Sequence, residues 1–487
     1  MNTKALRQKV LDLAIHGKLV PQNPNDESAT VLLEKIRAEK AEKIKKGELK
    51  ADKKDSFIFV GSDKRHYEQF ADGTVKDIED EIPFEVPDGW AWCRLSNACS
   101  ILMGQSPEGT SVSNNTNGME FHQGKIFFTN KYLAESGSYT AEITRIAPES
   151  SLLLCVRAPV GVVNITKREI CIGRGLCAIK PNYIIDENFW FYWIQCLKAD
   201  FEQKATGTTF KAISVDIIKQ QLIPLPPLLE QQLIINTIER IFSHIENLEK
   251  EKNDLQNIIK QTKSKILDLA IHGKLVSQDP NDEPAEELLK RIATSDNRPY
   301  EKVDEEPFEI PDSWEWVKLT SICNKLVDGD HNPPKGIEKQ TEYIMASSRN
   351  INYDRLDDLE NVRYLTKEVF EIENNRTKAD KGDIFFTSVG TLGRSCIYSG
   401  DYNICFQRSV TVLNTKINNQ YLKYYFDSNF YQTYVIEHST GTAQMGFYLK
   451  EMANSPIAIP PMDEQARIVA RISDLFFQLD QIQNNLI

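Results

Sequence analysis

The sequence lacks several features that would place the chain in a familiar class of enzyme or membrane protein. No run of about 18 apolar residues occurs, so we expect no transmembrane helix, and the start MNTKALRQKV has no signal-peptide core. The nine cysteines include no CxxC pair, which disfavours a zinc ribbon and indicates reduced thiols in a cytoplasmic protein. The pattern GxxxxGK[ST] is absent, so the sequence predicts no P-loop ATPase.

The chain also has little positive charge for a protein that would bind nucleic acid by itself. Its formal net charge is −12. Segment 83–226 has 13 basic and 13 acidic residues, and segment 307–460 has 16 basic and 20 acidic residues. A DNA-binding function would therefore depend on local patches and on partner proteins rather than on the overall charge.

Three short patterns resemble functional motifs but favour structural interpretations. Gly173-Arg-Gly175-Leu-Cys-Ala178 matches GxGxxA, yet it lies in a strand-like run that no helix follows. Asn332-Pro-Pro-Lys335 is similar to the signature of amino-group DNA methyltransferases, but Lys335 cannot stack on a flipped base, so we interpret it as a loop. His16 and His272 each precede a glycine at a predicted helix end, where the helix dipole favours histidine. We expect no catalytic residue and no metal ligand.

What the sequence does contain is a long internal repeat. LDLAIHGKLV occurs at 11–20 and again at 267–276. Three further pairs match in order: PFEVPDGWAW (83–92) with PFEIPDSWEW (307–316), TGTTFKAIS (206–214) with TGTAQMGFY (440–448), and LPPLLEQQ (225–232) with IPPMDEQA (459–466). The period is too long for a solenoid, so the chain consists of two copies of a domain-sized unit.

The second copy ends before its own LDLAIHGKLV, and the missing end stands at the N-terminus. Ile487 corresponds to Asn253 and Met1 corresponds to Asn257, so only about three positions are skipped between the two chain ends. We therefore expect a circularly permuted, pseudo-twofold repeat. The two termini should lie side by side, each supplying part of one split helix.

Apolar residues recur at steps of three and four through 228–272, with breaks at Lys252 and Thr262, and the equivalent segments near both termini continue the pattern. This heptad repeat predicts a long antiparallel coiled-coil helix pair of about 45 residues and about 65 Å. The predicted seam comprises Leu6, Val10, Leu13, Ile234, Ile238, Ile241, Ile245, Leu248, Leu255, Ile259, Ile468, Ile472, Leu475, Leu479 and Ile482.

Between the anchors lie two variable segments, which we call the first body (83–226) and the second body (307–460). Both alternate short β-rich runs with turn residues, and each has one amphipathic stretch, 188–203 or 420–435, that predicts a helix. The expected β-rich runs are 125–129, 151–156, 175–181, 383–389 and 404–413. We expect an α+β fold in which the helix pair joins two mixed α/β bodies.

The bodies define the expected division of the chain. The divisions are 1–50 (a helical segment completing the distal helix), 51–82 (linker), 83–226 (first body), 227–292 (central helix region), 293–306 (linker), 307–460 (second body) and 461–487 (distal helix). The Lys/Glu-rich run 35–54 is typical of a solvated helix end, and its counterpart in the second copy is much shorter.

Loops of small and polar residues in the two bodies are the candidate DNA contacts. The paired TGT loops let the backbone approach phosphate, although a plain scaffold turn is an equally good interpretation. Arginine and glutamine suit base edges, but any single one is more often structural or solvated. The candidates are Gln105, Ser106, Arg157, Arg174, Thr206, Gly207, Thr208, Thr209, Lys211, His331, Asn332, Arg349, Asn350, Arg394, Gln407, Arg408, Thr440, Gly441, Thr442 and Gln444.

These features together resemble the specificity subunit of type I restriction–modification systems, and the resemblance covers essentially the whole chain. It implies that each body is a target-recognition domain for half of a split DNA site. It also implies that the helices set the unread spacer and dock two adenine-N6 methyltransferase subunits, which restriction subunits join. S-adenosylmethionine, ATP and magnesium would then serve those partners, and this chain would bind no cofactor and catalyse nothing. The resemblance does not account for the long stretch 35–82.

Two other classes of function remain open from the residues alone. A stand-alone DNA-modifying enzyme would turn over without partners and would depend on a titratable residue. A protein scaffold would show no sequence preference on DNA. The contrast between near-identical anchors and divergent loops in one chain disfavours the scaffold.

Overall fold

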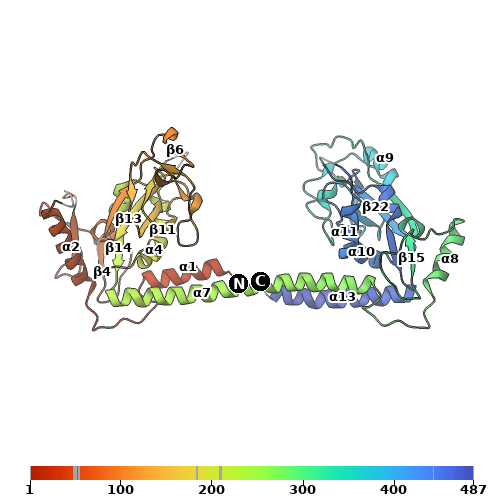
Figure 1. The fold of residues 1–487 in the computed structure, drawn as a ribbon, viewed down its shortest axis with the longest axis horizontal. Coiled ribbons are helices and arrows are strands. Elements are labelled where there is room, and N and C mark those ends of the chain that lie inside the picture. Colours follow the sequence, from red (N-terminus) through yellow and green to blue (C-terminus); the bar gives the residue numbers. More distant parts are fainter. Residues whose placement is uncertain are drawn as a thin grey trace. The chain divides into compact units, whose positions relative to one another are not determined.

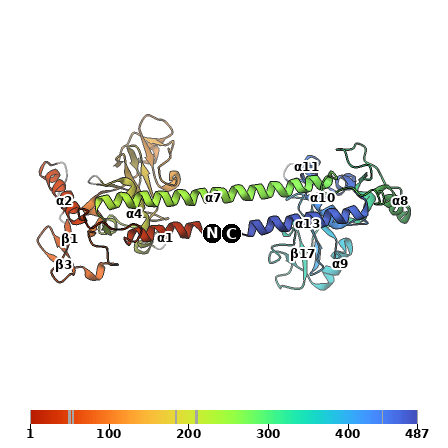
Figure 2. The same cartoon turned by 90° about the horizontal axis from the view of Figure 1, so that it is seen from below.

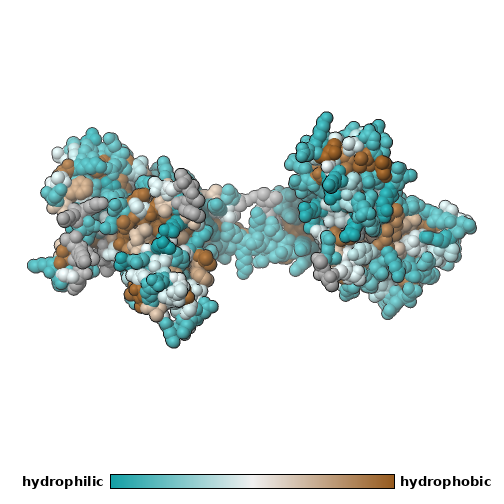
Figure 3. Space-filling model, turned by 90° about the horizontal axis from the view of Figure 1, so that it is seen from above, coloured by the Kyte–Doolittle hydropathy of each residue, from teal (hydrophilic) through white to brown (hydrophobic). Residues whose placement is uncertain are grey.

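The computed structural model describes residues 2–47, 52, 55–181, 185–207, 211–441 and 444–485. The chain forms two compact units, residues 1–250 and 251–487. In each unit a mixed α/β body stands on one side of a pair of helices (Figure 1). Within the described ranges, no helix combines the length and the apolar character that a membrane span requires. On the face in Figure 3, hydrophilic residues cover most of the surface.

The first helix of the first unit is α1 (Thr3–Ile15). It begins at Asn2, whose side-chain oxygen accepts a hydrogen bond from the backbone N–H of Ala5 at 3.0 Å. It ends before Gly17, which has a φ of +65° and so takes the left-handed conformation typical of a helix C-terminus. The predicted helix at 3–16, with Gly17 directly after its end, is confirmed.

The longest helix is α7 (Leu228–Ile271), which confirms the helix expected over 228–272. Within the first unit α1 runs antiparallel to the first half of α7, and Figure 2 shows the two side by side. Near the start of α1, Arg7 donates to Glu249 at 3.1 Å. Beyond its end, Gln22 donates to Glu230 at 3.1 Å.

The second unit has the equivalent pair, formed by the second half of α7 and α13 (Met462–Asn485). Lys263 donates to Asp480 at 2.6 Å, and Gln278, after the end of α7, donates to Glu464 at 2.6 Å. The order of these contacts makes this pair antiparallel as well.

The predicted seam residues differ in burial along the helices. Seven of them are buried: Val10, Ile234, Ile238, Ile245, Ile259, Ile468 and Ile472. All of these except Ile245 and Ile259 belong to the hydrophobic core that packs a body against its helices. Leu13, Ile241, Leu255, Leu475 and Leu479 are half-buried. Leu6 near the start of α1, Leu248 in the middle of α7 and Ile482 near the end of α13 are 40%, 47% and 47% exposed. Contact with a body therefore accounts for the burial of five of these seven residues, and a coiled coil over the full length stays a prediction.

The repeated sequence motifs meet in space. In the first unit the indole N–H of Trp90 donates to Glu230 at 2.9 Å, which joins the PFEVPDGW motif to the LPPLLEQ motif. The rings of His16 and Phe84 lie 4.1 Å apart, and Gly17 lies against the ring of Pro87. A side chain at Gly17 would overlap Pro87, so this close approach requires glycine.

The second unit repeats these contacts. Trp314 donates to Glu464 at 3.0 Å, the rings of His272 and Phe308 are 4.0 Å apart, and Gly273 lies against Pro311. The backbone carbonyl oxygens of Asp12 and Asp268, four residues earlier, lie 2.7 Å from the Nδ1 atoms of His16 and His272. The structural interpretation of both histidines, as residues that end a helix, is confirmed.

The first body is built on three sheets and short helices. Its sheets have the strand orders β11-β10-β13-β5, β6-β8-β7-β12-β9 and β14-β4. The strands are β4 (Ala91–Arg94), β5 (Cys99–Met103), β6 (Val112–Ser113), β7 (Met119–His122), β8 (Tyr139–Thr140), β9 (Ile146–Ala147), β10 (Ser151–Cys155), β11 (Val163–Thr166), β12 (Ile170–Ile172), β13 (Leu176–Pro181) and β14 (Leu222–Leu225). The helices are α3 (Leu95–Ala98), α4 (Glu187–Cys196), α5 (Lys198–Lys204) and α6 (Val215–Lys219). The fully buried rings of Phe189, Trp190 and Trp193 on α4 belong to its main core.

The second body follows the same plan, with the strand orders β16-β22-β19-β20, β18-β17-β21 and β15-β23. The strands are β15 (Glu315–Lys318), β16 (Cys323–Asp328), β17 (Tyr343–Ala346), β18 (Arg363–Tyr364), β19 (Ile384–Thr387), β20 (Ser395–Ile397), β21 (Asn403–Phe406), β22 (Val410–Thr415) and β23 (Pro456–Ile459). The helices are α9 (Lys367–Thr377), α10 (Asn419–Asp427), α11 (Asn429–Glu437) and α12 (Leu449–Asn454). The α/β character expected for both bodies is confirmed.

Several predicted elements differ in detail. The helices expected at 188–203 and 420–435 are each two helices. Ser428 is extended at the second break, where its hydroxyl accepts from the backbone N–H of Tyr431 and so caps α11. The run 125–129, expected as a strand, contains a 3-10 turn at Lys125–Phe127. Phe127 and Phe128 pack against the core, whereas Ile126 is 85% exposed, so the apolar residues of this run do not share one buried face.

The stretch 55–82, expected as a linker, is also different. It contains the antiparallel sheet β1 (Ser56–Val60), β2 (His66–Phe70) and β3 (Val75–Asp77). The preceding helix α2 (Ala29–Lys45) covers most of the Lys/Glu-rich run. The strands are too short for a clear alternation, and one of the contacts that hold them is distant in sequence: buried Glu68 on β2 pairs with buried Arg94 on β4 at 2.7 Å.

Candidate nucleic-acid interface

Each body carries an exposed arginine on a tight turn between two strands. In the first body β12 leads through Gly173–Gly175 into β13, and Arg174 is at the apex. In the second body β21 leads through residues 407–409 into β22, and Arg408 is at the equivalent position. The turn separates what the sequence presented as one continuous β-rich run at 404–413. No helix follows Gly175, so the structure agrees with rejecting a dinucleotide motif.

A second loop is hydrogen-bonded directly to each arginine turn. In the first body the backbone N–H of Gln105 donates to the carbonyl of Ile172 at 2.9 Å. In the second body the N–H of Asp330 donates to the carbonyl of Phe406 at 2.8 Å. Gly104 and Gly329 precede these residues, and an added Cβ at either would overlap a backbone carbonyl of the facing turn. Glycine therefore lets the two loops approach so closely.

The TGT loops join the same surface through the edge of the body. In the first body the backbone N–H of Val156 donates to the carbonyl of Gly175 at 3.0 Å. The next residue, Arg157, forms an isolated β-bridge with Ala212, and the N–H of Thr206 donates to the carbonyl of Ala212 at 2.9 Å. In the second body Val389 bridges to Gly446, to which Thr440 donates at 3.0 Å. The candidates Thr208, Thr209 and Thr442 lie outside the described residues, and Gly207, Lys211, Gly441 and Gln444 are exposed.

In the first body, side chains connect the loops as well. The hydroxyl of Ser106 donates to the side-chain oxygen of Gln123 at 2.8 Å, and Nε of Arg174 donates to that hydroxyl at 3.4 Å. Gln123 was not among the sequence candidates. It is a single polar residue after a short strand, and only the pairing of β7 with β12 brings it here.

In the second body the candidates lie in two groups. His331 and Asn332 are exposed in the loop after β16, beside the turn of Gln407 and Arg408. Arg349 is exposed on a segment held there by the N–H of Ser348, which donates to the hydroxyl of Ser409 at 3.0 Å. The segment after Asn332 is a loop, as expected, and Arg363 donates to the carbonyl of Pro334 at 2.9 Å.

Two candidates in the second body, Asn350 and Arg394, are not exposed. Asn350 is 1% exposed, and its amide donates to the carbonyl of Asp358 at 3.0 Å, so we leave it out of the proposed contact surface. Arg394 is half-buried at the far end of the segment that starts at Val389. Its guanidinium lies 5.9 Å from the ring of Tyr353, which is 49% exposed and was also missed from the sequence.

Carboxylates make the second surface electrostatically different from the first. Burial, together with the neighbouring Asp330, raises the pKa of Glu373 on α9 to about 7. A backbone hydrogen bond from Asn332 lowers the pKa of Asp330. Burial raises the pKa of Asp328, which accepts a hydrogen bond from Thr411 at 2.9 Å. The charge beside the second arginine turn therefore changes near neutral pH.

The cysteines pack as small apolar residues. None of the nine is in a disulfide, and burial raises the pKa of the Cys93 and Cys177 thiols to about 12, so these thiols stay protonated. Among the residues that the structure describes, no three His, Cys, Asp or Glu side chains gather as a metal site would require.

Comparison with known proteins gives one consistent result. The family model for the type I restriction modification DNA specificity domain matches residues 87–257 and 311–487. The EcoEI specificity subunit of Escherichia coli is 26% identical, over 99% of this chain and 90% of that protein. The EcoAI specificity subunit of the same species is 29% identical over 66% of this chain and 63% of that protein.

A third relative, the putative MjaX specificity subunit of Methanocaldococcus jannaschii, is 38% identical over 39% of this chain and 44% of that protein. The crystal structure of the HsdS subunit from Thermoanaerobacter tengcongensis has a TM-score of 0.48 at 16% identity, covering 84% of this chain and 94% of that one. Because the family model matches both halves of the chain, this protein belongs to the family of type I restriction–modification DNA specificity domains.

Proposed function

We propose that this chain is the DNA-recognition subunit of a type I restriction–modification complex, in which each body reads one half of a bipartite site. The observation that carries the proposal is the same succession of hydrogen-bonded loops in both bodies, with different side chains on them. Gln105 in the first body corresponds to Asp330 in the second, and their loops bond to the turns of Arg174 and Arg408. A shared scaffold with different exposed groups fits two different half-sites.

The exposed residue types suit DNA. An arginine at the apex of a turn can donate two hydrogen bonds to O6 and N7 of guanine, the commonest specific contact in the major groove. The small residues of the TGT loops and Lys211 suit phosphate oxygens, which position a protein without reading sequence. We propose 83–226 and 307–460 as the two recognition domains on this basis.

The helices would set the distance between the half-sites. The antiparallel contacts of Arg7 with Glu249 and of Lys263 with Asp480 support a pairing of α7 with α1 in one unit and with α13 in the other. Extended into one coiled coil with the two termini side by side, a helix of about 65 Å would correspond to at most about 19 base pairs. The unread spacer would follow from this length.

Two adenine-N6 methyltransferase subunits and the restriction subunits would complete the complex in the cytoplasm. Those partners would bind S-adenosylmethionine, ATP and magnesium, and this chain would contribute recognition without catalysis. The net charge of −12 supports a division of labour in which the methyltransferases supply much of the phosphate contact. The isolated chain should therefore bind DNA weakly, and adding the methyltransferase should increase both affinity and salt dependence.

The direct test is a genome-wide map of N6-methyladenine in cells that express the partner methyltransferase, with and without this chain. The proposal predicts that one gapped, two-part motif loses methylation when the chain is absent. An unchanged map in cells with active methyltransferase would refute the recognition function and favour a protein scaffold.

A further inference from the structure

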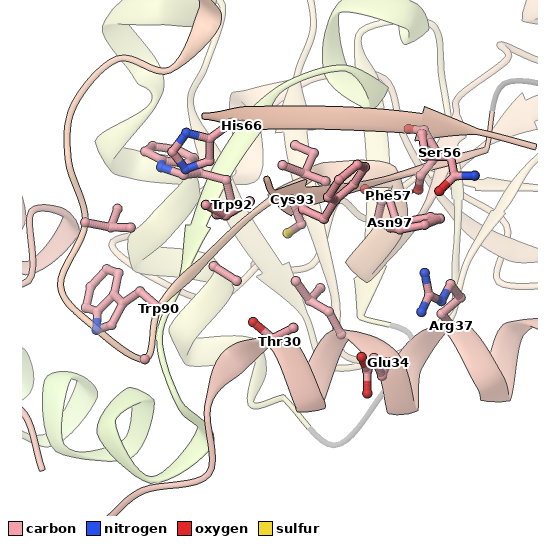
Figure 4. Close-up of a pocket in the computed structure, with 18 of the residues that line it drawn as sticks. Thr30, Glu34, Arg37, Ser56, Phe57, His66, Trp90, Trp92, Cys93 and Asn97 are labelled. Atoms are coloured by element: carbon pink, nitrogen blue, oxygen red, sulfur yellow. Dashed lines mark hydrogen bonds between the residues drawn. The ribbon is translucent and has the colours of Figure 1, made fainter. Parts of the chain in front are cut away.

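An open cleft lies in the first unit, between α2 on one side and strands β1, β2 and β4 on the other. Its volume is about 820 Å³, within the range of about 300–1,000 Å³ typical of sites for small molecules. Figure 4 shows Thr30, Glu34 and Arg37 along α2, with Cys93 and Phe57 across the space. The recognition surface uses none of these residues.

The second unit fills the equivalent space with its own chain. There α8 (Ala285–Asp296) is followed by a short segment that lies along β15, where Lys318 donates its N–H to Glu301 at 2.9 Å. Tyr300 and Val303 of this segment pack against the core. Leu289 on α8 is 0% exposed, whereas Leu33, the equivalent residue on α2, is only half-buried and lines the cleft.

The first unit has no such hydrogen-bonded segment beside β4 in its described part. The β1–β2–β3 sheet lies there instead, and Glu68 and Ser56 fix it through Arg94 and Asn97. This sheet leaves apolar side chains facing the open space. The apolar wall opposite Leu33 is formed by half-buried Phe57, Val86 and Ala91 and by buried Trp90, Trp92 and Cys93.

The charged groups around the cleft are unevenly matched. Lys40 pairs with Asp55 at 2.5 Å, and His66 lies 2.9 Å from Glu79. The guanidinium of Arg37 lies 4.3 Å from the centre of the Phe57 ring and has no ion pair within the described residues. In Figure 4 Arg37 reaches toward the side of Ser56 and Asn97, and Trp90 is at the opposite end. An anionic group is therefore favoured at the Arg37 end. Two acidic residues that precede Trp90 in the sequence, Glu85 and Asp88, also line the cleft.

We propose that this cleft is a binding site for a small ligand with an apolar ring system and one anionic group. The rings would lie between Leu33 and the apolar wall, where Tyr300 and Val303 supply the filling in the second unit. The anionic group would pair with Arg37. Because the second unit fills its equivalent space, the ligand binds once per chain. The site is separate from the proposed DNA contacts, so its occupancy does not depend on the proposed function.

The test is titration of the full-length chain with 8-anilinonaphthalene-1-sulfonate, which combines aromatic rings with one sulfonate. We expect fluorescence to saturate at one probe per chain. Arg37→Glu should weaken binding by roughly fivefold or more, as expected for loss and reversal of an exposed ion pair. Lys43→Glu makes the same charge change on α2 outside the cleft and should leave binding unchanged.

Leu33→Trp should fill the space and remove the saturable signal, with circular dichroism and the melting temperature showing that the chain stays folded. If that variant does not fold, the comparison of Arg37→Glu with Lys43→Glu decides alone. Equal affinities for these two variants would overturn the proposal, as would several equivalent probe sites per chain. Displacement of the probe by an added methyltransferase subunit would identify the cleft as a protein interface and overturn the small-ligand assignment.

Discussion

At the scale of single residues, a tryptophan and a buried glutamate join the repeated motifs in each unit. Glu230 is 2% exposed and accepts hydrogen bonds from Trp90 and Gln22. Burial raises the pKa of this carboxyl group, and the two donors oppose that shift. Removing one donor would leave a buried acceptor incompletely satisfied, which costs more free energy than the hydrogen bond itself contributes.

Trp90→Phe should therefore destabilise the first unit by about 2 kcal/mol or more, because hydrogen bonds to charged groups contribute roughly 1.5–3 kcal/mol. Trp92→Phe is the matched control, since Trp92 is equally buried and its indole N–H has no partner in the described residues. Urea unfolding followed by circular dichroism measures both variants. Equal losses of stability would contradict this role for the Trp90–Glu230 hydrogen bond.

Glu373 gives the second surface a pH response. Its pKa of about 7 means that the side chain is mostly neutral at pH 6 and mostly anionic at pH 8. The negative charge that develops near the arginine turn should repel DNA, so affinity of the assembled complex should fall as pH rises from 6 to 8. Fluorescence anisotropy with a cognate duplex measures this, and Glu373→Gln should flatten the pH profile. Glu371→Gln on the same helix should leave the profile unchanged.

The raised pKa of Glu373 also makes the stability of the folded chain depend on pH. The folded pKa lies above the value of 4.5 for the unfolded group, so the folded state binds more protons between these pH values. The contribution of Glu373 to stability is therefore full below about pH 4.5 and is lost as pH rises through about 7. Because glutamine does not ionise, the Glu373→Gln variant should not lose this stability between pH 4.5 and pH 8.

At the scale of helices and strands, the spacing of apolar residues and the exact repeat of LDLAIHGKLV were enough to predict the long helices. Helix α7 and the ending of α1 before Gly17 follow from local residues. Ser428 breaks its helix through local contacts with Tyr425 and Tyr431, which the continuous apolar period across 420–435 concealed. The pair of Glu68 with Arg94 that holds β2 joins residues distant in sequence, so no local pattern reveals it. Gln123 reaches the candidate interface for the same reason.

The close approach of the Gln105 loop to the turn of Arg174 can be tested by a substitution at Gly104. Gly104→Ala should push the Gln105 loop away from the arginine turn, because an added Cβ overlaps the carbonyl of Gly173. We expect reading of one half-site to weaken by tenfold or more while the other stays intact. Gly109→Ala is the control, since a Cβ there meets nothing within 4 Å. Binding to duplexes altered in one half-site at a time distinguishes the outcomes.

The buried Arg94–Glu68 pair should hold the three-stranded sheet to the first body. Arg94→Ala leaves Glu68 buried without its ion-pair partner, which typically costs about 3–5 kcal/mol, so we expect faster hydrogen exchange across residues 55–82. Arg65→Ala breaks an exposed pair with Asp77 and should change exchange little. Unchanged exchange in both variants would contradict this anchoring role.

At the scale of the whole molecule, the proposed function separates recognition from spacing. Inserting seven residues into α7, with a matching insertion in its partner helix, adds about 10 Å and about three base pairs. The methylated motif should then gain a longer spacer between unchanged half-sites. A changed half-site sequence at constant spacing would contradict the proposal that the helices set the spacer.

The central claim is that the two bodies read separate half-sites, and one measurement tests it most directly. N6-methyladenine is mapped in cells carrying the partner methyltransferase and either Arg174→Ala or Arg408→Ala. The account predicts that Arg174→Ala relaxes the sequence of one half-site only, and that Arg408→Ala relaxes the other. If both variants altered the same half-site, or if neither changed the motif, the two arginine turns would not be the reading elements.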